Sequence, residues 1–400
     1  MEPKNLFQRR LLAVLLLAVS LSACQSLTVH EPAPANCPPC PKCPGVDLAQ
    51  PASKPLQVAD WKDLPGWEED DVRAAWPAFL QSCRVLTVKA PTWKKVCAEA
   101  AGVDSKSSAA VRRFFEGNFQ PFAATAADGK TEGLITGYYE PLLKGSRTPG
   151  KLAKVPVYGV PDDLLTIDLS EVLPELRHMR LRGRLVGNKV VPYYARRDIE
   201  ENRGARLGTP LLWVEDQVEL FFLQVQGSGR VKLPDGKLVR LGYADQNGHP
   251  YQSIGRVLIE RGELKAGEAS MQGIQAWARA NPGKLQEVLN ANPSYVFFRE
   301  LPASDDGPLG ALGVPLTAER SLAVDPRAIP LGAPVFLATT RPNSSQPLNR
   351  LMLAQDTGGA IKGVVRADFF WGFGAKAGEE AGRMKQSGKM WVLLPKELAP

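Results

Sequence analysis

Two aspartates near the C-terminal end of the chain are the residues best suited to chemistry. Asp356 and Asp368 stand twelve residues apart, among glycines that let the backbone bend and aromatic side chains that exclude water. Such surroundings raise a carboxyl pKa toward the range useful for proton transfer. The pair therefore indicates an acid/base site in a groove of carbohydrate size, with Asp325 upstream as a third acid. The alternative is that all three cap turns, because Asp is common beside Gly and Pro in loops.

The composition leaves few other chemistries. The chain has three histidines, His30, His178 and His249, too few for a histidine-rich zinc site or a Ser-His-Asp triad, so we expect no metal and no cofactor. A net charge of +7 over 400 residues is too small and too dispersed to favour nucleic acid. What remains is a carboxylate acting on a hydroxyl-rich substrate, with aromatic and polar side chains as possible sugar contacts. These are Tyr138, Tyr139, Gln224, Gln226, Ser228, Phe370 and Trp371, each of which could instead be a packing or solvent-facing residue.

The N-terminus predicts the compartment. Basic residues precede an apolar run from Leu11 to Leu21, and Ser22-Ala23-Cys24 follows, which resembles the bacterial lipobox. The resemblance implies a signal peptide over 1–23, acylation of Cys24, and sorting to the periplasmic face of the Gram-negative outer membrane, since Gln25 is not Asp. Residues 24–60 are rich in Pro and small residues, which favours a lipid-anchored linker.

The other cysteines form two groups. Cys83 and Cys97 could close a disulfide in an oxidising compartment, provided that their Cα atoms come close enough. Cys37, Cys40 and Cys43 alternate with prolines, which favours an extended tether over a metal cluster lacking a fourth ligand.

The periodicity predicts helices first and strands afterwards. Apolar residues repeat at helical spacing between Trp61 and Phe122, as core stripes. Strands are expected at 134–141, 189–194 and 218–226, a turn at 227–229, and a hairpin over 231–241. Two helices are expected, near 253–260 and 270–280, and short strands return beyond Asn292, as in a compact barrel rather than a βαβ array.

Five motifs give the chain a specific resemblance. They are Thr136-Gly-Tyr-Tyr-Glu-Pro141, Gln224-Val-Gln-Gly-Ser-Gly229, Asp245-Gln-Asn-Gly-His-Pro-Tyr251, Asn292-Pro-Ser-Tyr-Val-Phe-Phe298 and the set Asp325, Asp356 and Asp368. In this order they resemble the membrane-bound lytic murein transglycosylase A family, over roughly residues 61–396, and the acids resemble its C-terminal three-aspartate module.

The resemblance implies a fold. It is mainly β with N-terminal helices: a double-psi β-barrel catalytic domain formed by 61–140 and 299–400, and an inserted second β-barrel-like domain at 141–298 that contributes to the glycan groove.

It also implies a reaction on peptidoglycan glycan strands. The β-1,4 bond between N-acetylmuramic acid and N-acetylglucosamine would be cut without water, leaving 1,6-anhydromuramoyl ends, with Asp368 as acid and then base and Asp356 as its neighbour. Cell-wall synthesis complexes would be further partners. The expected substrate-binding residues are Thr136, Tyr138, Gln224, Gln226, Gly227, Ser228, Asp325, Gly358, Gly359 and Lys362. A non-catalytic peptidoglycan-binding lipoprotein and a hydrolytic muramidase are the alternatives.

Overall fold

The computed structural model describes residues 55–176 and 179–398. Our predictions for the signal peptide, for Cys24 and for the cysteines at 37, 40 and 43 lie outside these residues. The end of the predicted linker is described and differs from the prediction, since Leu56–Val58 form strand β1 and pair antiparallel with β2 (Phe119–Ala124). Within the described part of the chain, no helix has the length and apolarity needed to cross a membrane.

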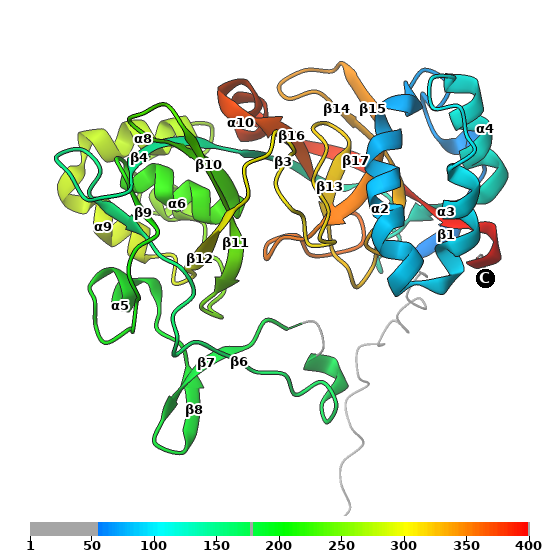
Figure 1. Ribbon diagram of the computed structural model, residues 1–400. Coiled ribbons are helices and arrows are strands. Elements are labelled where there is room, and N and C mark those ends of the chain that lie inside the picture. The colour runs from blue at the N-terminus through cyan, green and yellow to red at the C-terminus, as the bar shows by residue number, and fades with distance from the viewer. Residues whose placement is uncertain (1–54, 177–178, 399–400) are drawn as a thin grey trace, which may run out of the picture. The chain divides into compact units, whose positions relative to one another are not determined.

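The helical stripes predicted between Trp61 and Phe122 are confirmed as far as Asn118, whereas residues 119–122, predicted as helical, belong to strand β2. Trp76 and Phe79 on one helix pack against Phe115 on another, with ring centroids 5.9 and 5.3 Å apart, and all three are buried. Because these rings lie at helical spacing, each helix has an apolar face that joins the core cluster shared with the neighbouring sheet. The helices lie beside that sheet (Figure 1). The elements are η1 (Trp61–Asp63), η2 (Val72–Ala75), α2 (Trp76–Lys89), η3 (Pro91–Trp93), α3 (Lys94–Ala100) and α4 (Ser108–Asn118).

A disulfide joins the first two of these α-helices. Cys83 on α2 and Cys97 on α3 are bonded, with their Cα atoms 5.5 Å apart, so the pairing that the sequence left open is formed. The bond closes a loop with a sequence separation of 14. A loop of that size is worth about 3 kcal/mol in the chain-entropy model.

The largest sheet closes on itself. Its strand order is β1-β2-β17-β14-β15-β13-β16-β3, and β3 pairs with both β16 and β17, which completes a ring. Closure satisfies the backbone of the ring strands without leaving an edge among them. The strands are β3 (Gly133–Glu140), β13 (Ser321–Val324), β14 (Pro334–Thr340), β15 (Pro347–Asp356), β16 (Ala367–Phe373) and β17 (Lys385–Pro395).

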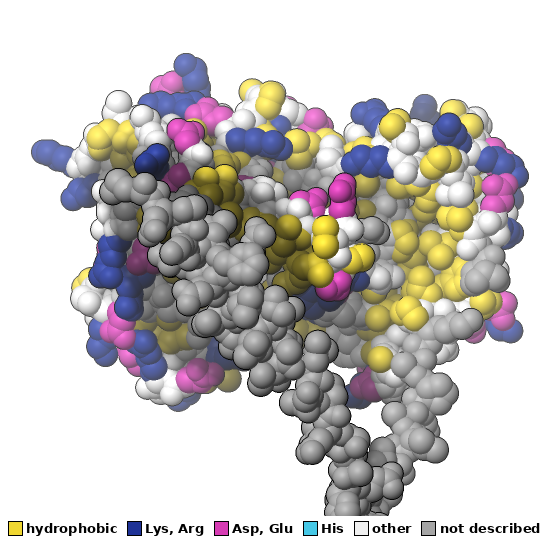
Figure 2. Space-filling view, turned by 90° about the horizontal axis from the view of Figure 1, so that it is seen from below, with side chains coloured by type: hydrophobic (Ala, Val, Ile, Leu, Met, Phe, Trp, Pro, Cys, Tyr) yellow, Lys and Arg dark blue, Asp and Glu magenta, His cyan; other side chains and the backbone are white. Residues whose placement is uncertain are grey.

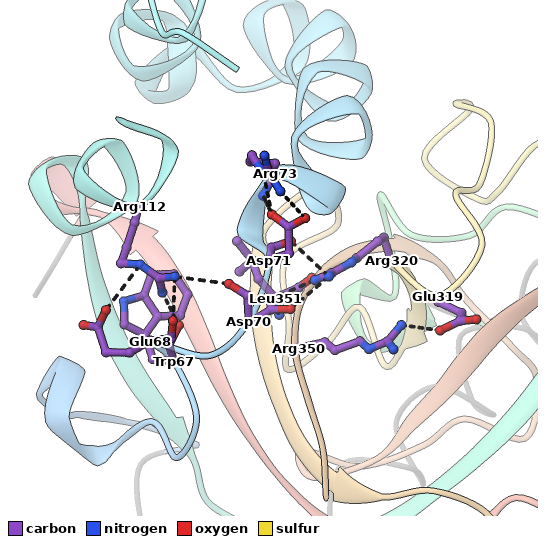
Figure 3. A network of polar contacts seen from close by, with 10 residues as sticks. All are labelled: Trp67, Glu68, Asp70, Asp71, Arg73, Arg112, Glu319, Arg320, Arg350 and Leu351. Carbon is purple, nitrogen blue, oxygen red and sulfur yellow. Dashed lines mark hydrogen bonds and ion pairs between the residues drawn. The ribbon is translucent and has the colours of Figure 1, made fainter. Parts of the chain in front are cut away.

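A buried ion pair ties the N-terminal segment to this barrel (Figure 3). Asp70 accepts two hydrogen bonds from the Arg320 guanidinium, at 2.8 and 2.9 Å, and a third from the Leu351 N–H at 2.8 Å. Both side chains are buried, so removing either one would leave the other charge unpaired, at a cost of about 3–5 kcal/mol. The barrel and the helices that precede it are therefore held as one unit at this point.

A second sheet lies between the two halves of the barrel in the sequence. Its order is β12-β11-β10-β4-β9-β5, and the hairpin predicted over 231–241 is confirmed as the antiparallel pair β10–β11. A small sheet, β6-β7-β8, extends from it and contains the strand predicted from Lys189. The strands are β4 (Leu142–Ser146), β5 (Val155–Val157), β6 (Leu165–Thr166), β7 (Arg182–Val186), β8 (Lys189–Pro192), β9 (Leu212–Val214), β10 (Ser228–Lys232), β11 (Leu238–Gln246) and β12 (Val296–Leu301).

One predicted strand was wrong. The run Val218 to Gln226 is most of helix α6 (Gln217–Gln226), because Asp216 accepts from the N–H groups of the first turn and Gly227, at φ 81°, ends the helix in the left-handed region. Phe221 and Leu223 are both fully buried there. A continuous apolar run gives no period that separates a buried strand from a buried helix, so the caps decided the outcome.

Helices also flank the second sheet, so the protein mixes helix and sheet more evenly than a mainly β class. The two helices expected near residues 253 and 270 are confirmed as α7 and α8. On the face shown in Figure 2, apolar side chains gather over the right-hand part of the described surface, and acidic and basic side chains lie mostly toward its edges. The remaining helices are α5 (Arg196–Glu200), α7 (Ile254–Glu260), α8 (Met271–Ala280), α9 (Pro282–Asn290), α10 (Gly374–Arg383), η4 (Pro174–Leu176) and η5 (Lys396–Leu398).

Candidate active site

Strand register brings Asp356 and Asp368 to the same face of the barrel sheet. Asp368 on β16 and Asp356 at the end of β15 both stand opposite Ala323 on β13, the strand between them. Residues directly opposite one another in adjacent strands point to the same side. Two strand spacings put their Cα atoms roughly 10 Å apart. The two acids therefore lie on either side of Ala323, on one face of the sheet.

Asp368 is a carboxyl group suited to carrying a proton near neutral pH. It is partly buried, and burial raises its pKa from the ordinary 3.8 to about 6, with the nearby charge of Asp356 acting in the same direction. The Thr136 hydroxyl, on the parallel strand β3, donates a 2.6 Å hydrogen bond to Oδ1 of Asp368, and this bond opposes the shift. A pKa of about 6 lets one group act as an acid and then as a base.

Asp356 is held in place by hydrogen bonds from a side chain and from the backbone. The Tyr138 hydroxyl donates to its Oδ2 at 3.0 Å, and the Ala311 N–H donates to its Oδ1 at 2.9 Å. Burial raises the pKa of Asp356, while hydrogen bonds from the Thr357 N–H, the Ala311 N–H and the Tyr138 hydroxyl lower it. Burial also holds the pKa of Tyr138 well above its usual range, so its hydroxyl remains a donor. Because Thr136 and Tyr138 are two residues apart on β3, one strand supplies a donor to each acid.

Asp325 has a different environment from the other two acids. Its side chain is buried and pairs with Arg327 at 2.6 Å, while the Gly363 N–H donates to it at 2.8 Å. The hydrogen bond from Arg327 holds the pKa of Asp325 well below its usual range. Its contacts match the turn-capping interpretation, in which Asp325 fixes the loop between β15 and β16. On that loop Gly358 is partly buried, whereas Gly359 and Lys362 are exposed.

The other expected sugar contacts do not gather around Asp368. Gln224 on α6 is buried and accepts a 2.6 Å hydrogen bond from Arg196 on α5. Gln226 accepts from the Tyr139 N–H at 3.0 Å, which ties α6 to β3 beside Tyr138. Gly227 is the α6 cap and the buried Ser228 begins β10. Among these, only Gln226 bonds a residue adjacent to the acid-binding side chains.

Two arginines near the acids were missed by the sequence reasoning. Arg366 donates to the Thr136 hydroxyl at 2.9 Å, and its place two residues before Asp368 was the available signal. Arg180 donates to the Thr357 hydroxyl at 3.0 Å, from the segment just before β7. Its positive charge opposes the rise in the pKa of Asp356. Nothing in the sequence links Arg180 to residues so far along the chain.

Two cavities of the described structure are lined by residues other than Asp356 and Asp368. One of about 110 Å³ is lined by Gly137, Tyr139, Gln226 and Met271, among others. Gly137 alternates with Thr136 and Tyr138 along β3, so this cavity lies on the other face of the strand. Another, of about 290 Å³, is lined by residues of β14, β15 and β17. In residues 55–176 and 179–398, no three His, Cys, Asp or Glu side chains come together as metal ligands would.

The chain matches two family models and several relatives. Residues 134–299 match the "MltA specific insert domain" and residues 320–394 match the "3D domain". The chain is 32% identical over 280 residues to membrane-bound lytic murein transglycosylase A of Vibrio cholerae, covering 68% of each sequence.

Two crystal structures illustrate the similarity of fold. One, of MltA from Neisseria gonorrhoeae, is 42% identical, with a TM-score of 0.75 over 88% of this chain and 99% of that one. The other, of E. coli MltA with bound chitohexaose, is 27% identical, with a TM-score of 0.63 over 88% and 96%.

Proposed function

Because this chain belongs to the membrane-bound lytic murein transglycosylase A family and is a peptidoglycan lytic transglycosylase, we propose that Asp368 carries out its bond cleavage as acid and then base. The proposed substrate bond is the β-1,4 linkage between N-acetylmuramic acid and N-acetylglucosamine, cut without water. The observation that carries the assignment is the Asp368 carboxyl itself, which is partly buried, bonded to Thr136 and has its pKa raised to about 6.

The reaction needs only one carboxyl group to move the proton. Protonated Asp368 donates to the glycosidic oxygen as the bond to C1 of the muramoyl residue breaks, which releases the N-acetylglucosamine hydroxyl. The resulting carboxylate takes the proton from the muramoyl C6 hydroxyl while that oxygen bonds to C1. The product has a 1,6-anhydro end, and Asp368 regains its proton. An internal nucleophile at high effective molarity removes the need for an activated water.

Asp356 has a supporting part in this proposal. Held by Tyr138 and the Ala311 N–H, it contributes negative charge that keeps the first proton on Asp368. Two nearby carboxylates resist joint ionisation, so the pair titrates as a unit. Tyr138 and Thr136 then fix the distance between the acids, because both extend from β3.

The substrate is proposed to be the glycan strand of peptidoglycan. The relative from E. coli is described with bound chitohexaose, a linear sugar chain, which supports a groove for extended glycans here. We propose that this groove lies between a double-psi β-barrel formed by 61–140 and 299–400 and an inserted domain at 141–298. The lipid anchor at Cys24, the outer-membrane location and the contact with cell-wall synthesis complexes belong to the same proposal.

The mass of the products tests this function. Purified peptidoglycan treated with the full chain should release muropeptides with anhydro ends, whose summed mass equals that of the uncut strand. A muramidase would add one water for each cut, and a glycan-binding lipoprotein would release nothing. Asp368→Asn should lower the release by about 10²–10⁴ or more, because an amide cannot donate the proton. Release by this variant near the wild-type rate would contradict the assignment of Asp368.

A further inference from the structure

Thr136 takes part in two hydrogen bonds whose directions can be worked out. Arg366 Nη2 lies 2.9 Å from the Thr136 hydroxyl oxygen, and that oxygen lies 2.6 Å from Oδ1 of Asp368. A guanidinium only donates, so the hydroxyl oxygen must accept from Arg366. Arg366 occupies one of the two lone pairs of that oxygen, and an ionised Asp368 can only accept, so the single hydroxyl hydrogen goes to Asp368. When Asp368 is ionised, the two hydrogen bonds therefore run from Arg366 to Thr136 and from Thr136 to Asp368.

The Arg366 guanidinium is itself hydrogen-bonded to both neighbouring strands, β3 and β16. Its Nη1 donates to the Leu134 carbonyl on β3 at 3.3 Å and to the Ala367 carbonyl on β16. These strands are the parallel pair in which Asp368 stands opposite Thr136. The arginine is thus placed by the backbone of the same two strands that carry the hydroxyl and the acid. Any small shift of Arg366 would be opposed by bonds on both sides.

We propose that Arg366 is a positioning residue for the acid–base step: it commits the Thr136 hydroxyl hydrogen to Oδ1 of Asp368 and so leaves Oδ2 as the oxygen that carries the transferred proton. This inference rests on the proposed function of Asp368. Without Arg366 the Thr136 hydroxyl could rotate and accept a hydrogen bond from either carboxyl oxygen. The proton of the acid would then be shared between Oδ1 and Oδ2, and only one of them can face the glycosidic oxygen in a given pose.

The charged and polar groups around Asp368 predict whether its pKa rises or falls when Arg366 is removed. The hydrogen bond from Thr136 and the positive charge of Arg366 both lower the pKa of Asp368, against burial and the charge of Asp356. Removing Arg366 should therefore raise this pKa above about 6. The groups placed around Asp368 are Thr136 and Tyr138 on β3, Asp356 on β15, Arg366 before β16, and Lys385, which stands opposite Thr136 in the β17–β3 register.

A double-mutant cycle separates the directed bond from simple charge. The variants are Arg366→Met, Thr136→Val and the double variant, with Arg147→Met as the control, because Arg147 pairs with Glu300 on the second sheet. Circular dichroism and melting temperature establish that each variant folds. Two pH titrations are then made on the full chain. One follows the carboxyl carbon of Asp368 by nuclear magnetic resonance after ¹³C-aspartate labelling, with the signal assigned by its loss in Asp368→Asn. The other follows kcat/KM for anhydromuropeptide release.

The expected result is an upward shift of about one pH unit in the Asp368 titration of Arg366→Met, and none for Arg147→Met. In the Thr136→Val background the shift caused by Arg366→Met should be clearly smaller, because the hydroxyl through which Arg366 acts is gone. An equal shift in both backgrounds, or no shift at all, would overturn the inference.

The two titrations also separate the inference from the proposed function. If Asp368 is the catalytic acid, the alkaline limb of the kcat/KM profile should move with the carboxyl titration, since the free enzyme must hold that proton. If the carboxyl titration moves and the activity profile does not, the hydrogen-bond chain stands and the catalytic role of Asp368 fails. If the carboxyl titration does not move, Arg366 is not a positioning residue, whatever the activity shows.

Discussion

Replacing Asp368 with asparagine should remove most of the activity and should also stabilise the folded protein. The stabilisation is expected only at a pH high enough for Asp368 to be ionised in the wild type. The pKa of Asp368 in the folded protein is raised to about 6 from 3.8, mainly by burial. A raised folded pKa means that the stability of the neutral form is fully present below the unfolded pKa and is lost as the pH rises to the folded pKa. Above about pH 6 the wild type must therefore hold a carboxylate that burial disfavours, whereas asparagine carries no charge.

The size of the effect follows from the pKa difference. Two units correspond to about 3 kcal/mol at 1.36 kcal/mol per unit, and solvent reaching the partly exposed side chain should reduce this to about 2 kcal/mol. We expect Asp368→Asn to unfold at higher urea concentration than the wild type at pH 8. The difference should shrink as the pH falls from about 6 toward 3.8, and it should nearly vanish only below that unfolded pKa, where Asp368 is neutral in the folded and the unfolded state.

Asp325→Asn is the matched control because it makes the same chemical change and should have the opposite effect on the stability of the folded protein. The pKa of Asp325 is held well below its usual range by Arg327, so its stabilisation is present above the unfolded pKa and is lost as the pH falls. This variant should be less stable than the wild type at pH 8, and the difference should shrink below about pH 4. Urea unfolding by circular dichroism at several pH values measures both. A stability difference for Asp368→Asn that is independent of pH, or a loss of stability at pH 8, would refute the reasoning.

Three further predictions concern anchoring, the disulfide and the second acid. Cys24→Ala should prevent acylation and release the protein from membranes, and continued palmitate labelling of the variant would contradict the lipobox interpretation. Cys83 and Cys97 should resist alkylation until reduced, and reduction should cost about 3 kcal/mol of stability; readily alkylated thiols in the untreated protein would remove the disulfide. Asp356→Asn should lower the rate less than Asp368→Asn and move the alkaline limb of kcat/KM to lower pH, because the charge of Asp356 raises the pKa of Asp368; a limb that moves up or stays would show that the acids are not coupled.

Residue spacing and turn residues within a short stretch of sequence correctly predicted several helices and one hairpin. The aromatic stripes of α2 and α4, the β10–β11 hairpin and helices α7 and α8 all occur as expected. Each depends on residue spacing or on a turn within about ten residues, which a single sequence displays directly. The same reasoning failed at α6, since a run that is apolar on every side has no period, and only its caps distinguish helix from strand.

In the candidate site too, some features could be predicted from the sequence and others depended on the tertiary structure. The sequence by itself indicated that Asp356 and Asp368 share a glycine-rich, aromatic environment, and its motifs indicated the family. That Ala323 stands between the two acids, and that Thr136 and Tyr138 each donate to one of them, was decided by the tertiary structure. The two hydrogen bonds join residues 232 and 218 positions apart in the chain. Pairing over such a separation depends on how the whole barrel closes, and no local preference of the residues involved can specify it.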